Sequence, residues 1–271
     1  MYHFVSGLPR SGSTLLGALL SQNPRIQAGM TSPAHHLVSA IMSAAAPQTE
    51  AGALMDDGAR ERAVKSVIEG VHRDTDADLV FDTNRNWTTK MSVLARLFPD
   101  FRMVAMVRPM AWVFDSIERK HRESPCSVSG IFPPNALTAR ERAAAMVRTD
   151  GFAGGPSQAL RDACFGPEGH RILVVDYQAL AKEPGTVLNV IYRHVGAVAW
   201  HGHDFSHVYF DADTFDARLG LDGLHRVQGD VRPPDRSLSL PPDLAEALAR
   251  HDWWQHDVGN AVIIRDPSAL S

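Results

Sequence analysis

A glycine loop that joins a short apolar segment to a helical pattern constrains the fold of this chain most strongly. Residues 3–6 are rich in apolar side chains and end at Gly7, which is typical of a buried strand followed by a turn. From Thr14 onward, apolar residues recur at helical spacing, at Leu15, Leu16, Leu19 and Leu20. The pattern stops at Asn23-Pro24, so it predicts a strand, a glycine loop and a helix in succession.

Further apolar strands alternate with helical patterns along the rest of the chain. The strands are predicted at residues 79–81, 102–107 and 171–176. Helices are predicted at about 34–45, 56–73, 88–98, 110–122, 138–149, 157–164, 186–194 and 242–250. Apolar strands separated by helices predict an α/β fold, a three-layer sandwich with a central, mainly parallel sheet.

The chain shows no break between two cores. Its 271 residues contain no long stretch rich in Gly, Ser or Pro, so we expect a single domain over residues 1–271. Prolines and glycine predict a loop at residues 123–137. Residues 200–241 are rich in His, Asp, Gly and Pro and show little periodicity, which favours a long functional loop or lid.

Charge and composition exclude several classes of partner. The net charge of −4 gives no reason to expect nucleic acid or an anionic membrane as partner. The apolar runs are too short to span a bilayer, and the first residues lack a basic signal-peptide region, so a cytoplasmic protein is expected. Cys126 and Cys164 have no partner motif, which predicts neither a disulfide nor a metal site.

The glycine loop itself has the spacing of a phosphate-binding loop. Gly7-x-x-x-x-Gly12-Ser13-Thr14 matches a Walker A motif with Ser13 where that motif requires Lys. Its backbone amides and the following helix N-terminus still suit an anion, and Arg10 supplies a cation. This combination favours a donor with a short anionic 5′ arm over a nucleoside triphosphate. A plain glycine turn with an incidental arginine is the alternative.

Two motifs carry a resemblance to a known family. The segment Leu8-Pro-Arg-Ser-Gly-Ser-Thr-Leu-Leu16 resembles the 5′-phosphosulfate loop of the P-loop-like sulfotransferases, bacterial type, that use 3′-phosphoadenosine 5′-phosphosulfate (PAPS). A buried strand ending at Arg108, with Ser116 eight residues later, is similar to the family's 3′-phosphate signature. The resemblance implies PAPS as donor and adenosine 3′,5′-bisphosphate (PAP) as product. It places the donor's 5′ end on Pro9, Arg10, Ser11, Gly12, Ser13 and Thr14.

Two weaker matches extend the resemblance to about residue 231. Tyr177, at the end of the strand at 171–176, corresponds to a tyrosine that lies close to the donor nucleotide in relatives. The segment Leu224-His-Arg-Val-Gln-Gly-Asp-Val231 occupies the place of a basic loop that closes over the 3′-phosphate. Arg226 is the candidate in that loop, with His225 as its substitute. A solvated loop is the alternative there.

The resemblance implies an in-line transfer to an acceptor oxygen or nitrogen, with Arg10 stabilising the leaving phosphate. The family positions for a general base hold no suitable residue in this chain. His35 and His36, near the start of a predicted helix, and Asp82, at the end of a predicted strand, are the substitutes. We favour His36 narrowly over Asp82, because a histidine needs no pKa shift to act near neutrality.

The acceptor and two rival functions remain open at this stage. A small-molecule or natural-product acceptor is expected, without further identification. A P-loop kinase for small molecules is one rival, and the missing Walker lysine weakens it. A non-catalytic, nucleotide-binding pseudoenzyme is the other.

Overall fold

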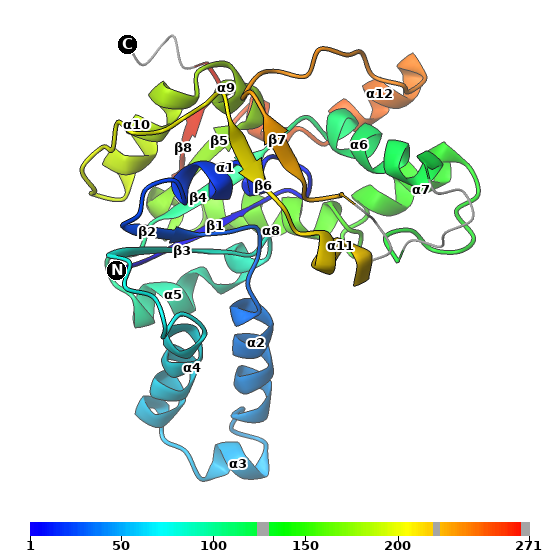
Figure 1. The fold of residues 1–271 in the computed structure, drawn as a ribbon. Coiled ribbons are helices and arrows are strands. Elements are labelled where there is room, and N and C mark those ends of the chain that lie inside the picture. The colour runs from blue at the N-terminus through cyan, green and yellow to red at the C-terminus, as the bar shows by residue number, and fades with distance from the viewer. Residues whose placement is uncertain (124–129, 219–222, 267–271) are drawn as a thin grey trace.

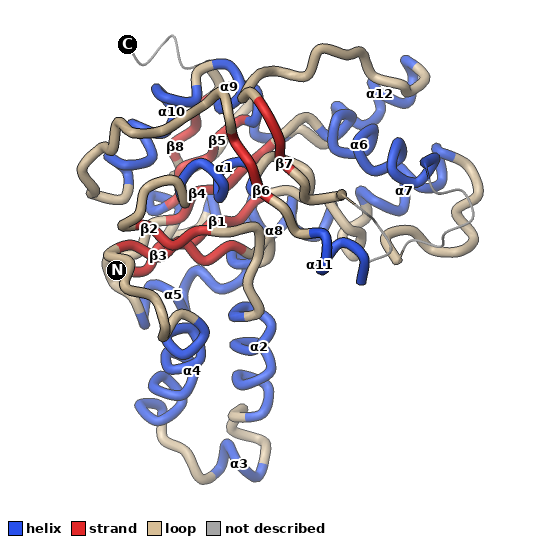
Figure 2. Tube along the Cα trace, viewed as in Figure 1, coloured by secondary structure: helices blue, strands red, loops and turns tan. Residues whose placement is uncertain are grey.

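A six-stranded parallel sheet forms the centre of the protein, as a computed structural model shows for residues 1–123, 130–218 and 223–266 (Figures 1 and 2). Every pair of neighbouring strands in it is parallel. The order is β2 (Ile26–Ala28), β3 (Leu79–Thr83), β1 (Tyr2–Gly7), β4 (Met103–Val107), β5 (Ile172–Asp176) and β8 (Val262–Ile264). Since β3 and β4 flank β1 on opposite sides, the connections change direction at β1, where open α/β sheets bind ligands.

Each central strand buries side chains on both faces of the sheet. In β4, Met103, Ala105 and Val107 join one apolar cluster, whereas Val104 and Met106 join the other. One face is covered by α1 (Ser13–Leu20), α9 (Tyr177–Lys182) and α10 (Pro184–His194). The other is covered by α5 (Met91–Leu97), α6 (Met110–Glu123), α7 (Ala139–Val147), α8 (Gly154–Phe165) and α12 (Pro242–Ala249). The predicted three-layer α/β sandwich is therefore confirmed.

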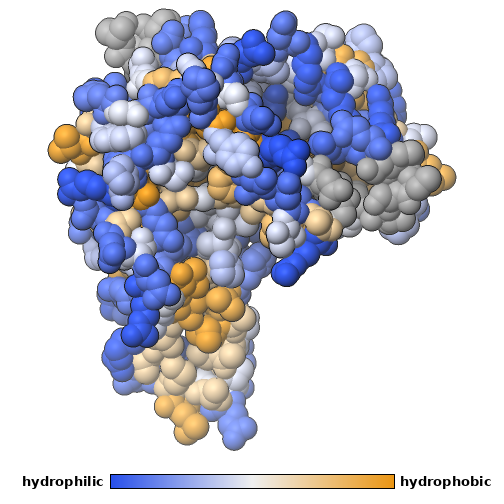
Figure 3. Space-filling view, in the orientation of Figure 1, coloured by the Kyte–Doolittle hydropathy of each residue, from blue (hydrophilic) through white to orange (hydrophobic). Residues whose placement is uncertain are grey.

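A helical arm projects from the sheet in Figure 1. It consists of α2 (Ala34–Ala44), α3 (Glu50–Ala53) and α4 (Asp57–Val71), with α2 packed against α4. Apolar side chains gather on this arm in Figure 3, and Leu37 and Leu54 are 45% and 85% exposed. No helix among residues 1–123, 130–218 and 223–266 is long and apolar enough to cross a membrane.

The region predicted as a lid contains regular structure. Strands β6 (Val208–Phe210) and β7 (Val227–Gly229) pair antiparallel, and α11 (Asp213–Arg218) lies between them in the chain. We call residues 205–232, apart from 219–222, which lie outside the described residues, the cover. The cover packs against α1. The sequence favoured a long functional loop or lid here without predicting these elements, because three-residue strands are too short to produce a detectable alternation.

Other differences from the expected elements are small. The edge strands β2 and β8 were not predicted, and the helix expected at 88–98 begins as a 3-10 turn, η1 (Trp87–Lys90). Two more 3-10 turns, η2 (Gly169–Arg171) and η3 (Trp253–Gln255), precede β5 and follow α12. Cys164 is buried as a free thiol in α8, whereas Cys126 and residues 124–129 of the predicted loop lie outside the described residues.

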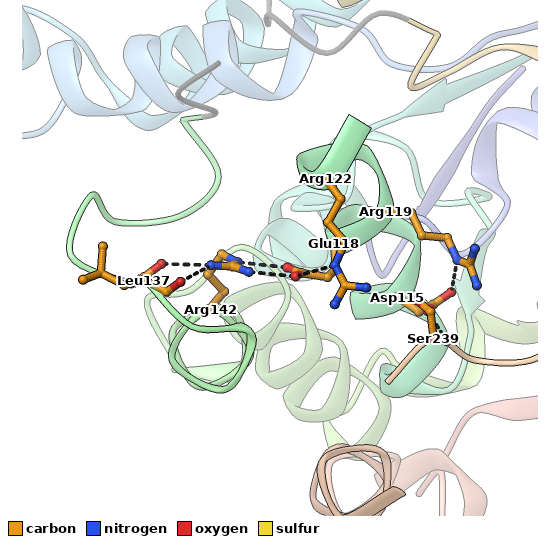
Figure 4. A network of polar contacts seen from close by, with 8 residues as sticks. Asp115, Glu118, Arg119, Arg122, Leu137, Arg142 and Ser239 are labelled. Carbon is orange, nitrogen blue, oxygen red and sulfur yellow. Dashed lines mark hydrogen bonds and ion pairs between the residues drawn. The ribbon is translucent and has the colours of Figure 1, made fainter. Parts of the chain in front are cut away.

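Two buried carboxylates anchor α6 (Figure 4). Asp115 accepts hydrogen bonds from Arg119 Nε at 3.0 Å and from Ser239 N and Oγ at 2.8 and 2.6 Å. Glu118 accepts from Arg142 Nη2 at 2.7 Å and from Arg122 Nε at 3.1 Å. These bonds tie α6 to α7 and to the segment that follows the cover.

Candidate functional site

The loop at the end of β1 requires glycine for steric reasons. Gly7 has φ +118°, and a Cβ on it would lie 2.0 Å from the backbone oxygen of Met106. The next amide, Leu8 N, donates to that same oxygen at 2.8 Å. The turn therefore lies directly against β4, which brings the loop and the end of β4 into one crevice.

The N-terminus of α1 opens into this crevice. Gly12 is the N-cap residue with φ +94°, and it has no side chain to satisfy the first backbone amides of the helix. A Cβ at this position would lie 2.5 Å from the ring of Tyr177, which packs against the loop from the start of α9. Together with Ser13 and Thr14, Gly12 lines a cavity, so the free amides are available to an anion there.

Arg10 lies in the middle of the loop in a strained conformation. Its φ of 58° makes it the one non-glycine residue with positive φ among the described residues. Its Nε donates to Ser116 Oγ at 3.1 Å, and its Nη1 donates to the backbone oxygen of Leu224 in the cover. Burial, together with the nearby Arg108 cation, lowers the pKa of Arg10 to about 10. Arg10 is thus held between α6 and the cover and stays charged at neutral pH.

Arg108 follows β4 directly and reaches the same cavity. Its Nη1 donates to the backbone oxygen of Arg10 at 3.3 Å. Its guanidinium lies 4.3 Å from the ring centroid of Tyr177 and 5.5 Å from that of Trp112. Burial lowers the pKa of Arg108, although the group remains protonated at pH 7. The structure therefore brings Arg10, Arg108, Ser116 and Tyr177 together from four separate elements.

The cavity has a volume of about 730 Å³ and a strongly cationic lining. Of the described residues that line it, the cations are Arg10, Arg85, Arg108, Arg226 and Arg232, and the carboxylate is Asp230. In the part of the chain that the structure describes, Arg10, Arg85 and Arg108 form no ion pair. Because a desolvated cation without a counterion is costly, the cavity favours an anionic ligand despite the overall charge of −4.

The roles of two arginines differ from the sequence prediction: Arg226 was a candidate and is already paired, and Arg85 was not a candidate but lines the cavity. Arg226 lines the cavity, but its Nη2 already donates to both oxygens of Asp213 at 2.8 and 2.6 Å. Arg85 was missed, although it follows the end of β3 much as Arg108 follows β4. Its guanidinium stacks on Phe152 at 4.1 Å, and burial lowers its pKa. The position after a buried strand was the signal that could have identified Arg85.

The base candidates occupy different environments. His36 lines the cavity. His35 does not line it; its ring packs edge-on against Trp87 at 5.2 Å, and burial lowers its pKa to about 4. Asp82 is buried away from the cavity, where it accepts hydrogen bonds from Ser32 Oγ at 2.5 Å and Trp87 Nε1 at 2.7 Å and contacts His72 Nε2 at 2.7 Å. Of the three, only His36 is brought to the ligand cavity.

Comparisons with known proteins identify a family for the chain and similar solved structures. A family model described as the sulfotransferase family matches residues 3–201. A sulfotransferase domain from the curacin biosynthetic pathway superposes with a TM-score of 0.51 at 14% identity, over 93% of this chain and 95% of that chain. Sulfotransferase STF9 from Mycobacterium avium gives 0.51 at 13% identity, over 96% and 78%.

A sulfotransferase from Alicyclobacillus acidocaldarius gives a TM-score of 0.51 at 15% identity, over 91% of this chain and 88% of that chain. No curated protein matches the chain significantly. At these identities the structural likeness shows a shared fold. The family model ends before the cover, so Arg226 and its neighbours lie outside the matched range.

Proposed function

The chain belongs to the sulfotransferase family, and from this premise we propose that it transfers a sulfuryl group from PAPS to a hydroxyl or amine acceptor. The observation that carries the proposal is the convergence of Arg10, Arg85 and Arg108, none of them in an ion pair within the described residues, on the cavity beside the glycine loop. A sulfated bisphosphate nucleotide supplies the negative charge that these cations lack.

The donor-binding residues are assigned from their place in the cavity and from the sequence resemblance. The amides at Gly12, Ser13 and Thr14 bind the 5′-phosphosulfate at the N-terminus of α1. Pro9 lines the same wall, and Ser11 holds the loop by donating to the Leu8 backbone oxygen at 2.5 Å.

Arg108 and Ser116 bind the 3′-phosphate, with Tyr177 beside the nucleotide. Ser116 lies next to Asp115, whose hydrogen bonds fix this part of α6. Arg226 already shares its charge with Asp213, to which its Nη2 donates, so a phosphate would compete with that carboxylate. We therefore expect Arg226 to contribute less to donor affinity than Arg108.

Arg10 is proposed to stabilise the leaving phosphate during transfer. Its positive φ and its bonds to Ser116 and Leu224 hold the guanidinium before the reaction begins. A preorganised cation lowers the barrier where charge develops, because the site does not need to reorganise. The supporting geometry is that Arg10 lies inside the loop proposed to hold the 5′ end.

The acceptor is proposed to be a small molecule with an apolar body. Ile131, Phe152 and Phe215 line the cavity together with Arg85 and His36. An apolar wall with a few polar groups is typical of small-ligand sites. A natural-product intermediate with a hydroxyl or amine group fits this lining.

A small-molecule kinase is the main rival. The lysine that reaches the β- and γ-phosphates in Walker A loops is replaced by Ser13, which donates no charge. A pseudoenzyme that binds the donor without turnover is the other rival, and only a turnover assay separates it from an enzyme.

Calorimetric titration with PAP, AMP and ATP tests the proposal. PAP is expected to bind about tenfold to a hundredfold more tightly than AMP, because a charged hydrogen bond contributes roughly 1.5 to 3 kcal/mol. Equal affinities for PAP and AMP would contradict the proposed 3′-phosphate site. Tighter binding of ATP than of PAP would favour the kinase.

A further inference from the structure

We infer that His225 in the cover is the general base of the transfer and that Asp216 is the residue that positions it. The inference rests on the proposed function, and it assigns a role that the expected base positions leave vacant. It depends on the contacts between α11, the segment before β7 and the phosphate loop.

The two side chains form a tightly bonded pair. His225 Nδ1 lies 2.6 Å from Asp216 Oδ1, and the backbone N–H of His225 donates to Asp216 Oδ2 at 2.8 Å. Asp216 is fully buried, and an ionised carboxylate only accepts hydrogen bonds. The proton of a neutral His225 is therefore on Nδ1, and Nε2 carries a free lone pair.

The free nitrogen belongs to a ring that lines the ligand cavity. The side chain of His225 is 22% exposed, and no described residue makes a hydrogen bond to its Nε2. The ring packs edge-on against Phe215 at 5.7 Å, which also lines the cavity. Two contacts thus fix the ring while one nitrogen remains available to an acceptor.

The pair is attached to the residue proposed to stabilise the leaving group. Arg10 donates to the backbone oxygen of Leu224, the residue directly before His225. His225 also lies close enough to Arg10 and Arg85 for both cations to affect its titration. The base and the leaving-group cation therefore meet where the cover crosses the phosphate loop.

The charges around His225 favour its neutral form. Burial lowers its pKa, Asp216 opposes this shift, and Arg10 and Arg85 reinforce it. Asp216 comes from α11, Arg10 from the phosphate loop and Arg85 from the end of β3, while Arg226 beside it is neutralised by Asp213. His225 is thus unprotonated at neutral pH, as a base must be.

The earlier candidates lack this arrangement. The ring of His36 packs edge-on against His35 at 5.6 Å, but it has no hydrogen-bond partner among the described residues, so no hydrogen bond selects its tautomer. Both oxygens of Asp82 are already bonded, and His35 is buried outside the cavity. Of the described histidines that line the cavity, His225 alone is paired with a carboxylate that orients it.

In the proposed step, His225 Nε2 removes the proton of the acceptor hydroxyl. The acceptor oxygen forms a bond to sulfur as the bond from sulfur to the bridging oxygen of the donor breaks. The electron pair of that bond stays on the 5′-phosphate of PAP, beside Arg10. The resulting imidazolium pairs with Asp216 until its proton passes to water.

The tautomer of His225 is the first test, and it needs no turnover. A ¹H–¹⁵N side-chain correlation spectrum at pH 7, assigned with His225→Gln, is expected to show a protonated Nδ1 and an unprotonated Nε2. In Asp216→Asn the amide donates to Nδ1, so the proton is expected to move to Nε2. Asp213→Asn removes a charge from the same helix and is expected to leave the tautomer unchanged. A protonated Nε2 in the unmodified protein would overturn the inference.

Conversion of PAPS to PAP in the presence of pooled phenols and aliphatic alcohols is the second test. His225→Gln is expected to lower the maximal rate by about 10² to 10⁴ and to change PAP affinity by less than about threefold. Activity of the unmodified protein should fall only below about pH 6.5, because its His225 pKa is lowered.

Normal turnover in His225→Gln would contradict the assignment of the base. A loss of maximal rate in His36→Gln that is not seen in His225→Gln would contradict it as well. Failure of the unmodified protein to bind PAP would instead contradict the proposed function, and the tautomer result would stand separately. Binding of PAP without any conversion of PAPS would overturn both catalytic roles.

Discussion

The phosphate loop and the cover meet at the same cavity but are held in place by different forces. The loop follows a central strand, and its backbone bonds directly to β4. The cover contains two strands of three residues and a short helix. Its attachments to the rest of the protein include apolar packing of β6 and β7 on α1 and the hydrogen bond from Arg10 to the Leu224 backbone oxygen.

This difference indicates how each region serves the site. A loop set by a buried parallel sheet keeps its shape without ligand, since moving it would break the sheet register. The cover packs on the surface of α1 through two short strands and is not part of the central sheet, so we expect it to open at a lower cost in free energy than the loop. We therefore expect changes to the loop backbone to affect folding, and changes in the cover to affect the chemistry without unfolding the protein.

The largest effect is expected from Gly7→Val in the loop. The new Cβ would lie 2.0 Å from the Met106 backbone oxygen, at a φ that β-branched residues do not adopt. We expect a loss of roughly 3 to 5 kcal/mol in the free energy of unfolding, measured by urea denaturation. Gly29→Ala is the control, because its Cβ would meet no atom within 4 Å. Equal stability of the two variants would contradict a rigid loop.

Arg10→Ala is expected to reduce turnover more than donor binding. Removing one preorganised donor to developing charge lowers rates by about 10² to 10³. PAP affinity, measured by calorimetry, should fall much less, because the guanidinium acts mainly as the bond breaks. A loss of affinity with an unchanged maximal rate would show that Arg10 only positions the donor.

Arg108→Ala and Arg226→Ala compare a guanidinium that follows a central strand with one in the cover. For Arg108→Ala we expect about a tenfold to hundredfold loss of PAP affinity and little change for AMP. The matched variant Arg226→Ala should lose less, since Asp213 already pairs with that guanidinium. If Arg226→Ala were the more damaging variant, the cover would dominate donor binding.

The smallest effect is expected at Asp115, which ties α6 to the segment that follows the cover. Burial raises the pKa of Asp115, but hydrogen bonds from Ser239, Arg236 and Arg119 outweigh burial and lower it to about 2. The folded pKa is below the unfolded value, so the stabilisation is present above about pH 4 and is lost as the pH falls toward 2. We expect Asp115 to account for roughly 2 kcal/mol of the free energy of unfolding that is lost over this pH range.

Urea denaturation between pH 5 and pH 2 measures that contribution. Asp115→Asn should show a correspondingly shallower fall in stability over this range than the unmodified protein. Asp243→Asn is a suitable control, because Asp243 forms an exposed pair with Arg140. Parallel pH profiles for the unmodified protein and Asp115→Asn would contradict the anchor.

Local patterns were sufficient to predict the centre of the fold. The strands β1, β3, β4 and β5 are buried on both faces, so each appears in the sequence as an apolar run. The edge strands β2 and β8 were missed because three residues carry no period. The cover was predicted as a region but not as elements, for the same reason.

The same distinction between local and distant residues applies to the site. The sequence by itself determined the glycine loop, Arg10 and the placement of Arg108 after a buried strand, because each depends on residues close in the chain. Only the tertiary structure decided that Asp82 is enclosed by His72, Trp87 and Ser32 rather than open to the cavity.

The tertiary structure also decided which histidine has a carboxylate partner at the cavity. No sequence period links Asp216 to His225, and 214 residues separate Arg10 from Leu224. Burial and pairing of polar side chains depend on which distant segments return to the same place. The backbone pattern of a short segment carries no information about that return.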